Sequence, residues 1–451
     1  MLEVIVRSKR DADAMKAVFR TFYGEWDFRV HTLHGARSLD KALEEIKDIV
    51  DDDKFYVLLL GREDEKVAME LDHILPPNIA VHIVPRAKIR NTRIEHLAHE
   101  LDVARSKIRL AVCWDNDSKT YVFMLRSGDR LPGYEYNPAY DVFLGLNTCM
   151  LEEILGGKIC GTPLLVRKFG GEHDVYCGKE LVGKLEIPDE GFKPTGKLFK
   201  QPDGDVGTSL DKVIEVNRKS MELYERVSKS FLSKYRDWAD TVIVPWSGGK
   251  DSTAALLLAL DVFPKNKIKV MFADTGTEFP QTIEYVEKIA KILGIKVHRV
   301  YAGVDKGILE EGMPMPTHSN RWCTGRKIAS IENGLRDLAE GNTLIITGDR
   351  DVESRTRSAR PPARHGEERV MIVSPLKLWS TAHVQLYILS KGIPMNPLYY
   401  MGFYRIGCYI CPALRSWEIY IMLNNKELRQ SLDKLELFRR FIEYRMKLKE
   451  K

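Results

Sequence analysis

The sequence lacks any apolar run of the roughly 18 residues that a membrane-spanning helix needs. Cysteine is also sparse: seven cysteines in 451 residues, an odd number, argue against the disulfide framework of a secreted protein. The first residues, MLEVIVRSKRDADAMK, are typical of a strand that leads into a charged helix and not of a signal peptide. We therefore expect a cytoplasmic protein without a membrane partner.

A large excess of charge of one sign is absent as well. The 69 Lys and Arg against 64 Asp and Glu give a formal net charge of +5. Such a small charge does not require a nucleic-acid partner, but it permits one where basic residues cluster. A hydrophobic content of 44% and a charged content of 29% are typical of soluble globular proteins. The length predicts roughly two to four domains.

Residues 1–95 show alternating strand and helix patterns without a phosphate-binding glycine motif. The expected strands are LEVIVRS, FRVHTLHG, KFYVLLLG and IAVHIVP, and charged helical segments follow the first two. Alternation of this kind predicts a small α/β domain with room for a parallel sheet. Nothing in its residues predicts a chemical role.

Residues 96–205 change pattern and predict a mixed, β-rich domain. IRLAVCW, TYVFMLRSG, FKPTGKLF and the segment from Gly161 to Ile187 read as short strands joined by glycine and charged turns. Cys160 and Cys177 flank a hairpin-like segment; they either share a metal or, as is commoner for isolated cysteines, are packed thiols. We interpret Cys113 and Cys149 as ordinary buried cysteines.

Residues 206–451 predict a larger α/β domain that ends in a helix. Helical periodicity over 209–240 leads into the strands TVIVPW, IKVMFAD, IKVHRVY and TLIITG, with helices such as FPQTIEYVEKIAKILG between them. This order is typical of a doubly wound parallel sheet, whose binding sites lie at the carboxyl ends of the strands. The charged tail over 424–451 predicts one helix.

The loop SGGKDS, residues 247–252, joins a strand to a helix in this third domain. Backbone amides at a helix N-terminus can face an anion, and Gly248 and Gly249 let the backbone come close to it. Lys250 adds a positive charge, and Ser247 and Ser252 add hydroxyl donors. Asp251 would repel a phosphate unless a divalent cation lay between them, which indicates Mg²⁺.

The loop is not a Walker P-loop, because that motif requires glycine at position 244, where this chain has Val. It resembles instead the S-G-G-x-D-S signature of the ATP pyrophosphatase (PP-loop) superfamily. Members of that superfamily cut ATP between the α and β phosphates and leave an adenylated substrate and pyrophosphate. The resemblance implies a Rossmann-like fold for this domain and ATP as its ligand.

Further motifs resemble one branch of that superfamily, the phosphoadenosine phosphosulfate (PAPS) reductase family, over about residues 240–415. They are FADTGTEFPQTIEYV, RWCTGRKI, TGDRDVESRTR and SPLKLWSTAHVQLYILSKGIPMNPLY, in the family order. The resemblance implies a catalytic role for Lys250, Asp251 and Arg350. It also implies that the nucleotide is bound by the six loop residues together with Asp274, Thr275, Gly348 and Arg355, with Arg350 near the phosphates. For Asp274 a helix N-cap is the alternative.

Two departures from the reductases matter. Those enzymes generally have Phe-Gly in place of Gly-Gly-Lys-Asp, whereas Lys250 and Asp251 are intact here, as binding ATP with a metal would require. They also end in a mobile Glu-Cys-Gly segment whose thiol attacks sulfur, whereas the last cysteine here is Cys411. Without that nucleophile the reductase reaction lacks its covalent step. Both departures favour activation of a substrate by ATP.

Cys323, in RWCTGRK, and Cys408 and Cys411, in GCYICP, are the candidate metal ligands. Iron–sulfur members of the family have a Cys-Cys pair at the first position, but Thr324 breaks that pattern here. A [4Fe–4S] cluster on three cysteines would leave one iron open, as in the iron–sulfur tRNA thiolases that it resembles. Zinc with a non-Cys ligand and a redox-active C-x-x-C without metal remain the alternatives.

The segment RTRSARPPARH, between Arg355 and His365, has four arginines and no acid. It is either a phosphate-binding lid over the nucleotide or a solvated, partly disordered loop.

Together these observations predict an ATP-dependent adenylating enzyme. We expect it to be a sulfurtransferase that modifies a nucleic-acid base, with tRNA as the first choice of substrate and the first two domains as docking modules. Its expected partners are ATP, a sulfur donor and tRNA or another nucleic acid; the oligomeric state is left open, with a homodimer as one candidate. The alternatives are a divergent PAPS or adenylyl sulfate reductase that uses Cys408 or Cys411, and a non-catalytic nucleotide-binding iron–sulfur scaffold.

Overall fold

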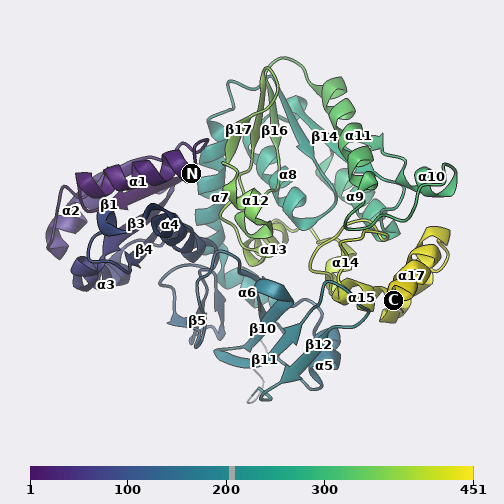
Figure 1. Cartoon of the computed structure of the whole chain (residues 1–451), viewed down its shortest axis with the longest axis horizontal. Helices are drawn as coiled ribbons and strands as arrows, with labels where there is room; N and C mark the ends of the chain where they lie inside the picture. Colours follow the sequence, from purple (N-terminus) through teal and green to yellow (C-terminus); the bar gives the residue numbers. More distant parts are fainter. Residues whose placement is uncertain (203–208, 450–451) are drawn as a thin grey trace.

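A computed structural model describes residues 1–202 and 209–449 of the chain and shows an α/β protein with four sheets (Figure 1). The predicted boundary at residues 205 and 206 lies outside the described residues. None of the helices described is both long and apolar enough to cross a membrane.

The first sheet has the strand order β2-β1-β3-β4, with every strand parallel to its neighbours. The strands are β1 (Leu2–Val6), β2 (Val30–Thr32), β3 (Phe55–Gly61) and β4 (Ile79–Val84). The helices are α1 (Lys9–Phe22), α2 (Leu39–Ile49), α3 (Glu65–Ile74) and α4 (Ile94–Arg109), with short turns η1 (Arg62–Asp64) and η2 (Ile89–Asn91). Successive residues of β3 enter two different cores, one under α1 and α4 and one under α2 and α3. Burial on both faces explains why β3 is an unbroken apolar run.

The middle of the chain forms two antiparallel sheets, as its short strand patterns predict. One contains β5 (Cys113–Asp115), β6 (Thr120–Val122) and β7 (Asp129–Arg130). The other has the order β12-β11-β10-β9-β8 and contains β8 (Asp141–Leu144), β9 (Leu164–Arg167), β10 (Glu172–Cys177), β11 (Glu180–Glu186) and β12 (Thr195–Leu198). The helix α5 (Thr148–Leu155) and the turn η3 (Phe169–Gly171) join these strands. The strand expected at IRLAVCW is wrong in its first half, because Ile108 and Arg109 end the helix α4.

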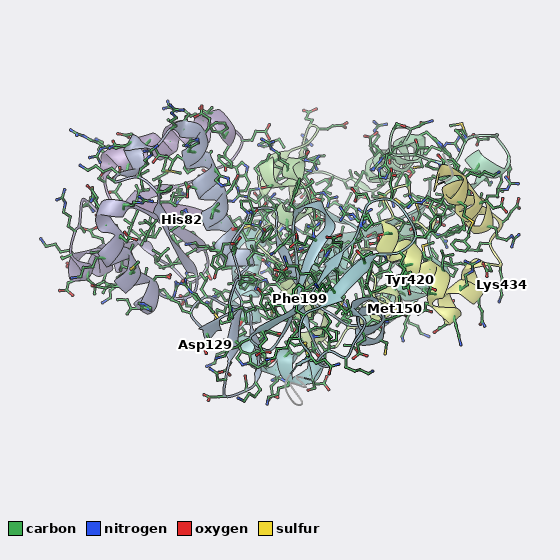
Figure 2. All side chains as sticks on the ribbon, turned by 60° about the horizontal axis from the view of Figure 1, so that its bottom comes forward. His82, Asp129, Met150, Phe199, Tyr420 and Lys434 are labelled. Carbon is green, nitrogen blue, oxygen red and sulfur yellow. A yellow bond between two sulfur atoms is a disulfide. The ribbon has the colours of Figure 1, made fainter. Side chains whose placement is uncertain are left out.

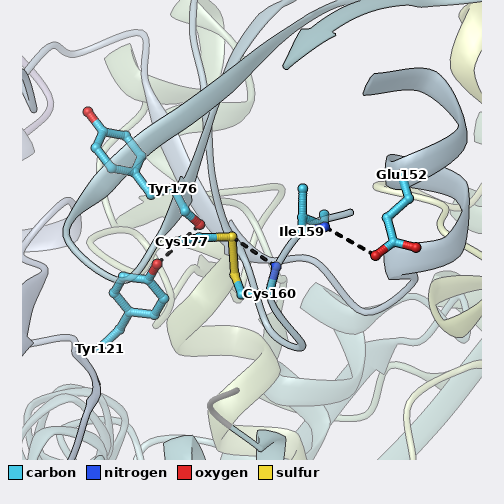
Figure 3. Close-up of a disulfide and its surroundings, with 6 residues drawn as sticks. All are labelled: Tyr121, Glu152, Ile159, Cys160, Tyr176 and Cys177. Atoms are coloured by element: carbon cyan, nitrogen blue, oxygen red, sulfur yellow. Dashed lines mark hydrogen bonds between the residues drawn. A yellow bond between two sulfur atoms is a disulfide. The ribbon is translucent and has the colours of Figure 1, made fainter. Parts of the chain in front are cut away.

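Cys160 and Cys177 form a disulfide, so both earlier interpretations of this pair are wrong (Figure 3). Their Cα atoms are 5.7 Å apart because β10 brings Cys177 beside the segment that precedes β9. With both sulfurs in a covalent bond, neither residue is a packed thiol or a metal ligand. Cys113 is buried as expected, but Cys149 is exposed, so its prediction is wrong as well.

The third part is built on a six-stranded sheet with the order β15-β14-β13-β16-β18-β17. Its strands are β13 (Thr241–Pro245), β14 (Ile268–Asp274), β15 (Val297–Tyr301), β16 (Thr343–Ile346), β17 (Ala363–His365) and β18 (Val370–Val373). All are parallel to their neighbours except the edge strand β17. The chain winds outward from β13 on one side and continues from β16 on the other. The predicted doubly wound sheet is confirmed. The order in which the chain adds strands reverses between β13 and β16, which remain parallel to each other.

Helices cover both faces of this sheet and extend beyond it (Figure 1). They are α6 (Leu210–Val216), α7 (Arg218–Ser233), α8 (Lys250–Val262), α9 (Pro280–Leu293), α10 (Val304–Leu309), α11 (Trp322–Leu338), α12 (Arg355–Ala359), α13 (Thr381–Ser390) and α14 (Pro397–Tyr400). The short turns are η4 (Lys265–Lys267) and η5 (Asp351–Glu353). The remaining helices are α15 (Ser416–Asn424), α16 (Lys426–Leu432) and α17 (Glu436–Lys449). The charged tail is therefore two helices rather than the single one predicted.

Two cores join the parts of the chain. One extends from the first sheet through Tyr121 and Tyr224 into the six-stranded sheet. The other joins the five-stranded sheet and α5 to the C-terminal helices, where Met150 and Tyr420 lie close together (Figure 2). The segment between α14 and α15 thereby runs between the six-stranded and the five-stranded sheets.

Candidate nucleotide-binding site

The predicted phosphate loop lies at the point where the six-stranded sheet reverses its direction. It connects the carboxyl end of β13 to the first residue of α8. Gly248 has φ +71°, and a Cβ atom there would lie 2.9 Å from Cγ2 of Val286. Only glycine combines this left-handed conformation with such close packing. Gly248 thus serves the tight loop geometry that the sequence predicted.

The loop is held in shape by its own hydroxyl groups and by a tyrosine. The Oγ atoms of Ser247 and Ser252 are 3.1 Å apart, and the amide of Lys250 donates to Oη of Tyr399 at 2.9 Å. The first amides of α8 have no acceptor within the helix, as at any helix N-terminus. The loop therefore presents amide and hydroxyl donors at the positive end of a helix.

The side chain of Lys250 is buried and points away from the exposed edge of the loop. Its Nζ atom lies 3.1 Å from Oδ2 of Asp251 and 3.2 Å from the carbonyl oxygen of Tyr404. The rings of Tyr399 and Tyr404 also lie within 5.5 Å and 5.1 Å of it. The ammonium group is therefore held at the junction between the loop and the segment that follows α14.

Asp251 is paired with two cations of the protein. Its Oδ1 atom lies 2.7 Å from Nε of Arg350, and its Oδ2 atom contacts Lys250. Although burial raises the pKa of Asp251, the charges of Arg350 and Lys250 lower it below the ordinary value. These ion pairs hold the carboxylate in place at the start of α8. Mg²⁺ at Asp251 stays a prediction.

Arg350 lies on the loop after β16, across the reversal point from β13, and is 1% exposed. Besides Asp251, its guanidinium contacts Oδ2 of Asp141 at 3.2 Å and Oγ1 of Thr381 at 3.0 Å. The structure thus brings Arg350 together with Lys250 and Asp251, as a shared catalytic role requires. Its nitrogens are occupied by protein groups, so contact with a nucleotide phosphate stays a prediction.

Asp141 is a residue of the site that the sequence did not reveal. It lies on β8 of the five-stranded sheet, fully buried, and accepts from the amide and Oγ1 of Thr381 at 2.9 Å and 2.6 Å. Oη of Tyr404 donates to the same carboxylate at 2.8 Å. Burial alone would raise the pKa of Asp141, but the charges of Arg350 and Arg167 and the hydrogen bonds from Thr381 lower it. No local motif marks Asp141, because its partners are more than 200 residues away in the chain.

The other predicted nucleotide residues surround this group in different ways. Gly348 packs against the first turn of α8, where a Cβ atom would lie 2.7 Å from the carbonyl carbon of Asp251. Asp274 accepts from the amide of Gly276 at 2.8 Å and pairs with Arg299, so it caps a turn and not a helix N-terminus. The structure places Gly348 beside the loop and Asp274 at the end of the adjacent strand β14.

Thr275 and Arg355 differ sharply in exposure. Thr275 is buried, and its Oγ1 atom is 2.8 Å from Oγ1 of Thr277 and 3.0 Å from Oε1 of Glu278. Arg355 is exposed at the start of α12. Thr275 thus shapes the loop after β14, while the predicted roles of both residues in binding the nucleotide stay predictions.

The arginine-rich segment is ordered, so the interpretation as a partly disordered loop is wrong. It forms α12 and the edge strand β17, which pairs with β18. Arg357 pairs with Glu353 and Asp349, and Arg360 lies 3.6 Å from Asp349. These acids explain how the cluster of positive charge folds without a bound phosphate.

The three cysteines expected to bind a metal lie in one corner next to the loop after β14. The amide of Tyr409 donates to the carbonyl oxygen of Thr277 at 3.0 Å, which attaches the C-x-x-C segment to that loop. A hydrogen bond from Cys408 lowers the pKa of Cys411 to about 6 and raises that of Cys408. Burial raises the pKa of Cys323, and the nearby Cys411 raises it further. In the part of the chain that the structure describes, no three His, Cys, Asp or Glu side chains are arranged to hold a metal ion.

A cavity of about 140 Å³ lies between the five-stranded sheet and the segment that follows α14. Lys250 and Tyr399 form its wall on the side of the phosphate loop, and Phe143 lies on the side of β8. Phosphate loop, buried ion pairs and cavity thus adjoin one another. This arrangement can hold a nucleotide at the loop and a second molecule beside it.

A doubly wound sheet with a glycine-rich anion site at its reversal point defines a nucleotide-binding α/β protein. Residues 241–414 match the family model described as the phosphoadenosine phosphosulfate reductase domain. This part of the chain is similar to that domain, which agrees with the family resemblance of the motifs.

Known relatives show similarity over parts of their length. An uncharacterised protein of Methanocaldococcus jannaschii is 32% identical over 268 residues, which cover 58% of this chain and 54% of that protein. The adenosine 5'-phosphosulfate reductase of Rhodococcus erythropolis is 33% identical over 160 residues, which cover 35% of this chain and 62% of the enzyme. The chain therefore spans little more than half the length of the first and about three-fifths of the second. The crystal structure of PAPS reductase from Candida auris aligns with a TM-score of 0.34 and 19% identity, over 46% of this chain and 99% of that one.

Proposed function

We propose that the chain is an ATP-dependent adenylating enzyme that cleaves ATP between the α and β phosphates. The observation that carries this proposal is the intact SGGKDS loop at the N-terminus of α8, with Lys250 and Asp251 in place. The match of residues 241–414 to the phosphoadenosine phosphosulfate reductase domain supports the proposal.

The roles of the loop residues follow from their positions. Amides at the start of α8 and the hydroxyls of Ser247 and Ser252 would bind the pyrophosphate portion of ATP. Lys250, turned from Asp251 toward the phosphates, would stabilise the charge that grows on the leaving pyrophosphate. Arg350 would keep Asp251 paired when Lys250 moves. Asp251 is the carboxylate that would hold a Mg²⁺ ion bound together with ATP.

Pyrophosphate release from ATP tests this proposal directly. Lys250→Ala should lower the release rate roughly 100-fold, because one preorganised charge at the leaving group is lost. The matched control is Lys296→Ala, an exposed lysine of the same domain, which should leave the rate unchanged. Equal rates for the wild type and Lys250→Ala would refute the proposed role of the loop.

We further propose that the adenylated acceptor is a nucleic-acid base, as in tRNA, and that sulfur then displaces AMP. Cys323, Cys408 and Cys411 would hold a [4Fe–4S] cluster. These three cysteines lie in one corner of the structure, and cysteine thiolates are the usual ligands of such clusters. The side chains would have to move to reach ligand positions, since they form no metal-binding group as described. Such a cluster would supply the site that carries the sulfur. The chain itself would keep the three cysteines close to the phosphate loop.

Iron and sulfide analysis of anaerobically purified protein tests the cluster separately from adenylation. About four irons per chain, lost in Cys323→Ala and retained in Cys149→Ala, would agree with three cysteine ligands. Zinc in place of iron, or no metal at all, would remove sulfur transfer from the proposal. Pyrophosphate release would then stand alone.

Reduction of adenosine 5'-phosphosulfate is a second candidate function, because enzymes of that name are about 30% identical to this chain. The hydrogen-bonded pair Cys408 and Cys411 would supply its nucleophile, with Cys411 as the thiolate. Sulfite release from adenosine 5'-phosphosulfate with a thiol reductant, and its loss in Cys411→Ser, would favour this function. Pyrophosphate release from ATP without sulfite formation would exclude it.

A further inference from the structure

The loop that carries Arg350 is held from the N-terminal unit, the first sheet with its helices α1 to α4 (residues 2–109). Arg350 is followed by Asp351, which begins the turn η5 and is 3% exposed. The carboxylate of Asp351 pairs with Arg105 of α4, and its Oδ1 atom lies 2.7 Å from Nζ of Lys377. A buried ion pair thus joins the N-terminal unit to the six-stranded domain, one residue away from Arg350.

Arg105 is itself fixed by other residues of the N-terminal unit. Its side chain is 1% exposed, and its Nη1 atom donates to Oδ1 of Asp102 at 2.9 Å. Oη of Tyr23 donates to the same carboxylate at 2.7 Å. The guanidinium of Arg105 also lies over the ring of Trp26, 4.5 Å from its centroid, which is a favourable cation–π contact. Because a guanidinium presents several donors in a rigid fork, Arg105 can bridge Asp102 and Asp351 at once.

Trp26 makes a second connection from the N-terminal unit to the same loop. Its Nε1 atom donates to the carbonyl oxygen of Ala359, the last residue of α12, at 2.9 Å. Its ring is stacked on Phe28 with the two centroids 4.7 Å apart, which holds the indole in place. The segment 350–359 is therefore attached near its start by Arg105 and at its end by Trp26.

These contacts lead to the phosphate loop by a short path. Arg350 reaches the loop through Asp251, whose Oδ1 atom lies 2.7 Å from its Nε atom. Two ion pairs and one peptide bond therefore connect Arg105 to Asp251. Because the peptide unit is planar and stiff, a displacement of Asp351 moves the backbone of Arg350 with it. Charged groups of a site must be held to within about 0.5 Å by the contacts around them.

We propose that the N-terminal unit is a positioning module for the candidate nucleotide site. Arg105 and Trp26 are its positioning residues, and they hold the segment 350–359 in place. They thereby keep Arg350 beside Asp251, although neither of them touches the nucleotide. The expected effect on rate rests on the proposed function, whereas the expected effect on the order of the segment does not.

Hydrogen–deuterium exchange of the full chain measures whether the segment 350–359 is held. In the wild type the amide of Asp351 donates to the carbonyl oxygen of Lys377 at 3.1 Å, so it should exchange slowly. Trp26→Ala should speed exchange in this segment about tenfold, because a hydrogen bond and a cation–π contact are lost. Trp26→Phe retains a ring beside Arg105 but loses the Nε1 donor, and it should give a smaller increase. Unchanged exchange in Trp26→Ala would overturn the proposal.

Leu71→Ala is the matched control for a general loss of stability. Leu71 is fully buried in the other core of the N-terminal unit, under α2 and α3. The substitution opens a cavity and destabilises the unit, but it removes no contact with the segment 350–359. It should leave exchange in that segment unchanged. Exchange as fast as in Trp26→Ala would show that the segment responds only to the stability of the unit, and would overturn the proposal.

Pyrophosphate release from ATP measures the effect on the site. Arg105→Met removes the charge that faces Asp351 and should lower kcat about tenfold, as a small displacement of a site group does. The KM for ATP should stay within about twofold, because the amides and hydroxyls of the phosphate loop are unchanged. Arg105→Lys restores the charge without the fork that bridges two carboxylates, so it should recover part of the rate. Leu71→Ala should leave kcat unchanged.

The outcomes separate this inference from the proposed function. A wild-type chain that releases no pyrophosphate overturns the proposed function, and the exchange experiment still decides whether the N-terminal unit holds the segment 350–359. Wild-type rates in both Arg105→Met and Trp26→Ala overturn the inference and leave the proposed function intact. If Arg105→Met does not fold, Trp26→Ala decides both measurements, because Trp26 is only partly buried and its removal deletes no charge.

Discussion

At the scale of single residues, buried charges decide how the site is held. Asp141 and Arg350 are 0% and 1% exposed in their side chains, and each is the other's partner. An isolated buried charge is costly, so removing one partner leaves the other uncompensated. Asp141 therefore fixes the position of Arg350, and through Asp251 that of the phosphate loop.

Asp141→Asn should lower the free energy of unfolding by about 3 to 5 kcal/mol, since Arg350 stays buried with less compensating charge. Urea unfolding of the variant measures this loss. Asp129→Asn, an exposed carboxylate that pairs with Lys179, is the control and should leave the free energy of unfolding nearly unchanged. Equal costs for the two variants would show that the buried pair does not stabilise the fold.

His173 should make stability depend on pH. Its folded-state pKa is about 3, whereas in the unfolded chain the ring binds a proton below about pH 6.5. The unfolded state therefore holds more protons between these values, and the free energy of unfolding falls as the pH drops from about 6.5 to about 3. His173→Gln should weaken this fall by roughly 1.4 kcal/mol per pH unit within that window. His365→Gln, which changes an exposed ring, should leave the slope unchanged; no difference between the variants would contradict the assignment.

At the scale of elements, the phosphate loop depends on the helix that it begins and on the helix that it packs against. The glycine pair in the sequence predicted a tight loop that binds an anion. It did not reveal which glycine has the positive φ, or that Gly248 packs against α9. The same reasoning failed for the tail, where the periodicity continues through a break between α16 and α17. Local pattern gives the type of an element, whereas packing sets where it ends.

Gly248→Ala should weaken ATP binding and stability more than Gly312→Ala does. Both glycines have positive φ, +71° and +70°, so each substitution carries a backbone cost of about 1 to 2 kcal/mol. At Gly248 the added Cβ also meets Val286 at 2.9 Å, whereas at Gly312 nothing lies within 4 Å. Thermal unfolding and ATP titration of both variants measure the difference. Similar losses in the two would mean that packing against α9 is unimportant.

At the scale of the whole molecule, the six-stranded domain is not independent of the rest of the chain. The core under its sheet continues into the first sheet, and Arg350 is paired with a carboxylate of the five-stranded sheet. The cavity beside the phosphate loop needs both sheets as well.

A fragment of residues 209–451 should therefore fold poorly on its own, even though it contains every motif of the family. We expect a less cooperative thermal transition and loss of ATP binding relative to the full chain, because Arg350 loses Asp141 and apolar surface becomes exposed. Circular dichroism and ATP titration of the fragment provide the measurement. A fragment as stable and as active as the full chain would show that the first 208 residues are dispensable to the site.

The sequence by itself determined the doubly wound sheet, the phosphate loop and the similarity of residues 241–414 to one family, because periodicity and a short motif are local properties of the chain. It could not reveal that Asp251 is neutralised by Arg350, that Asp141 joins them, or that Cys160 and Cys177 are bonded. These facts depend on residues that are distant in sequence and become neighbours only when two sheets pack together. Tertiary structure alone decided them, because the energy of a buried charge depends on its surroundings in space and not on its neighbours along the chain.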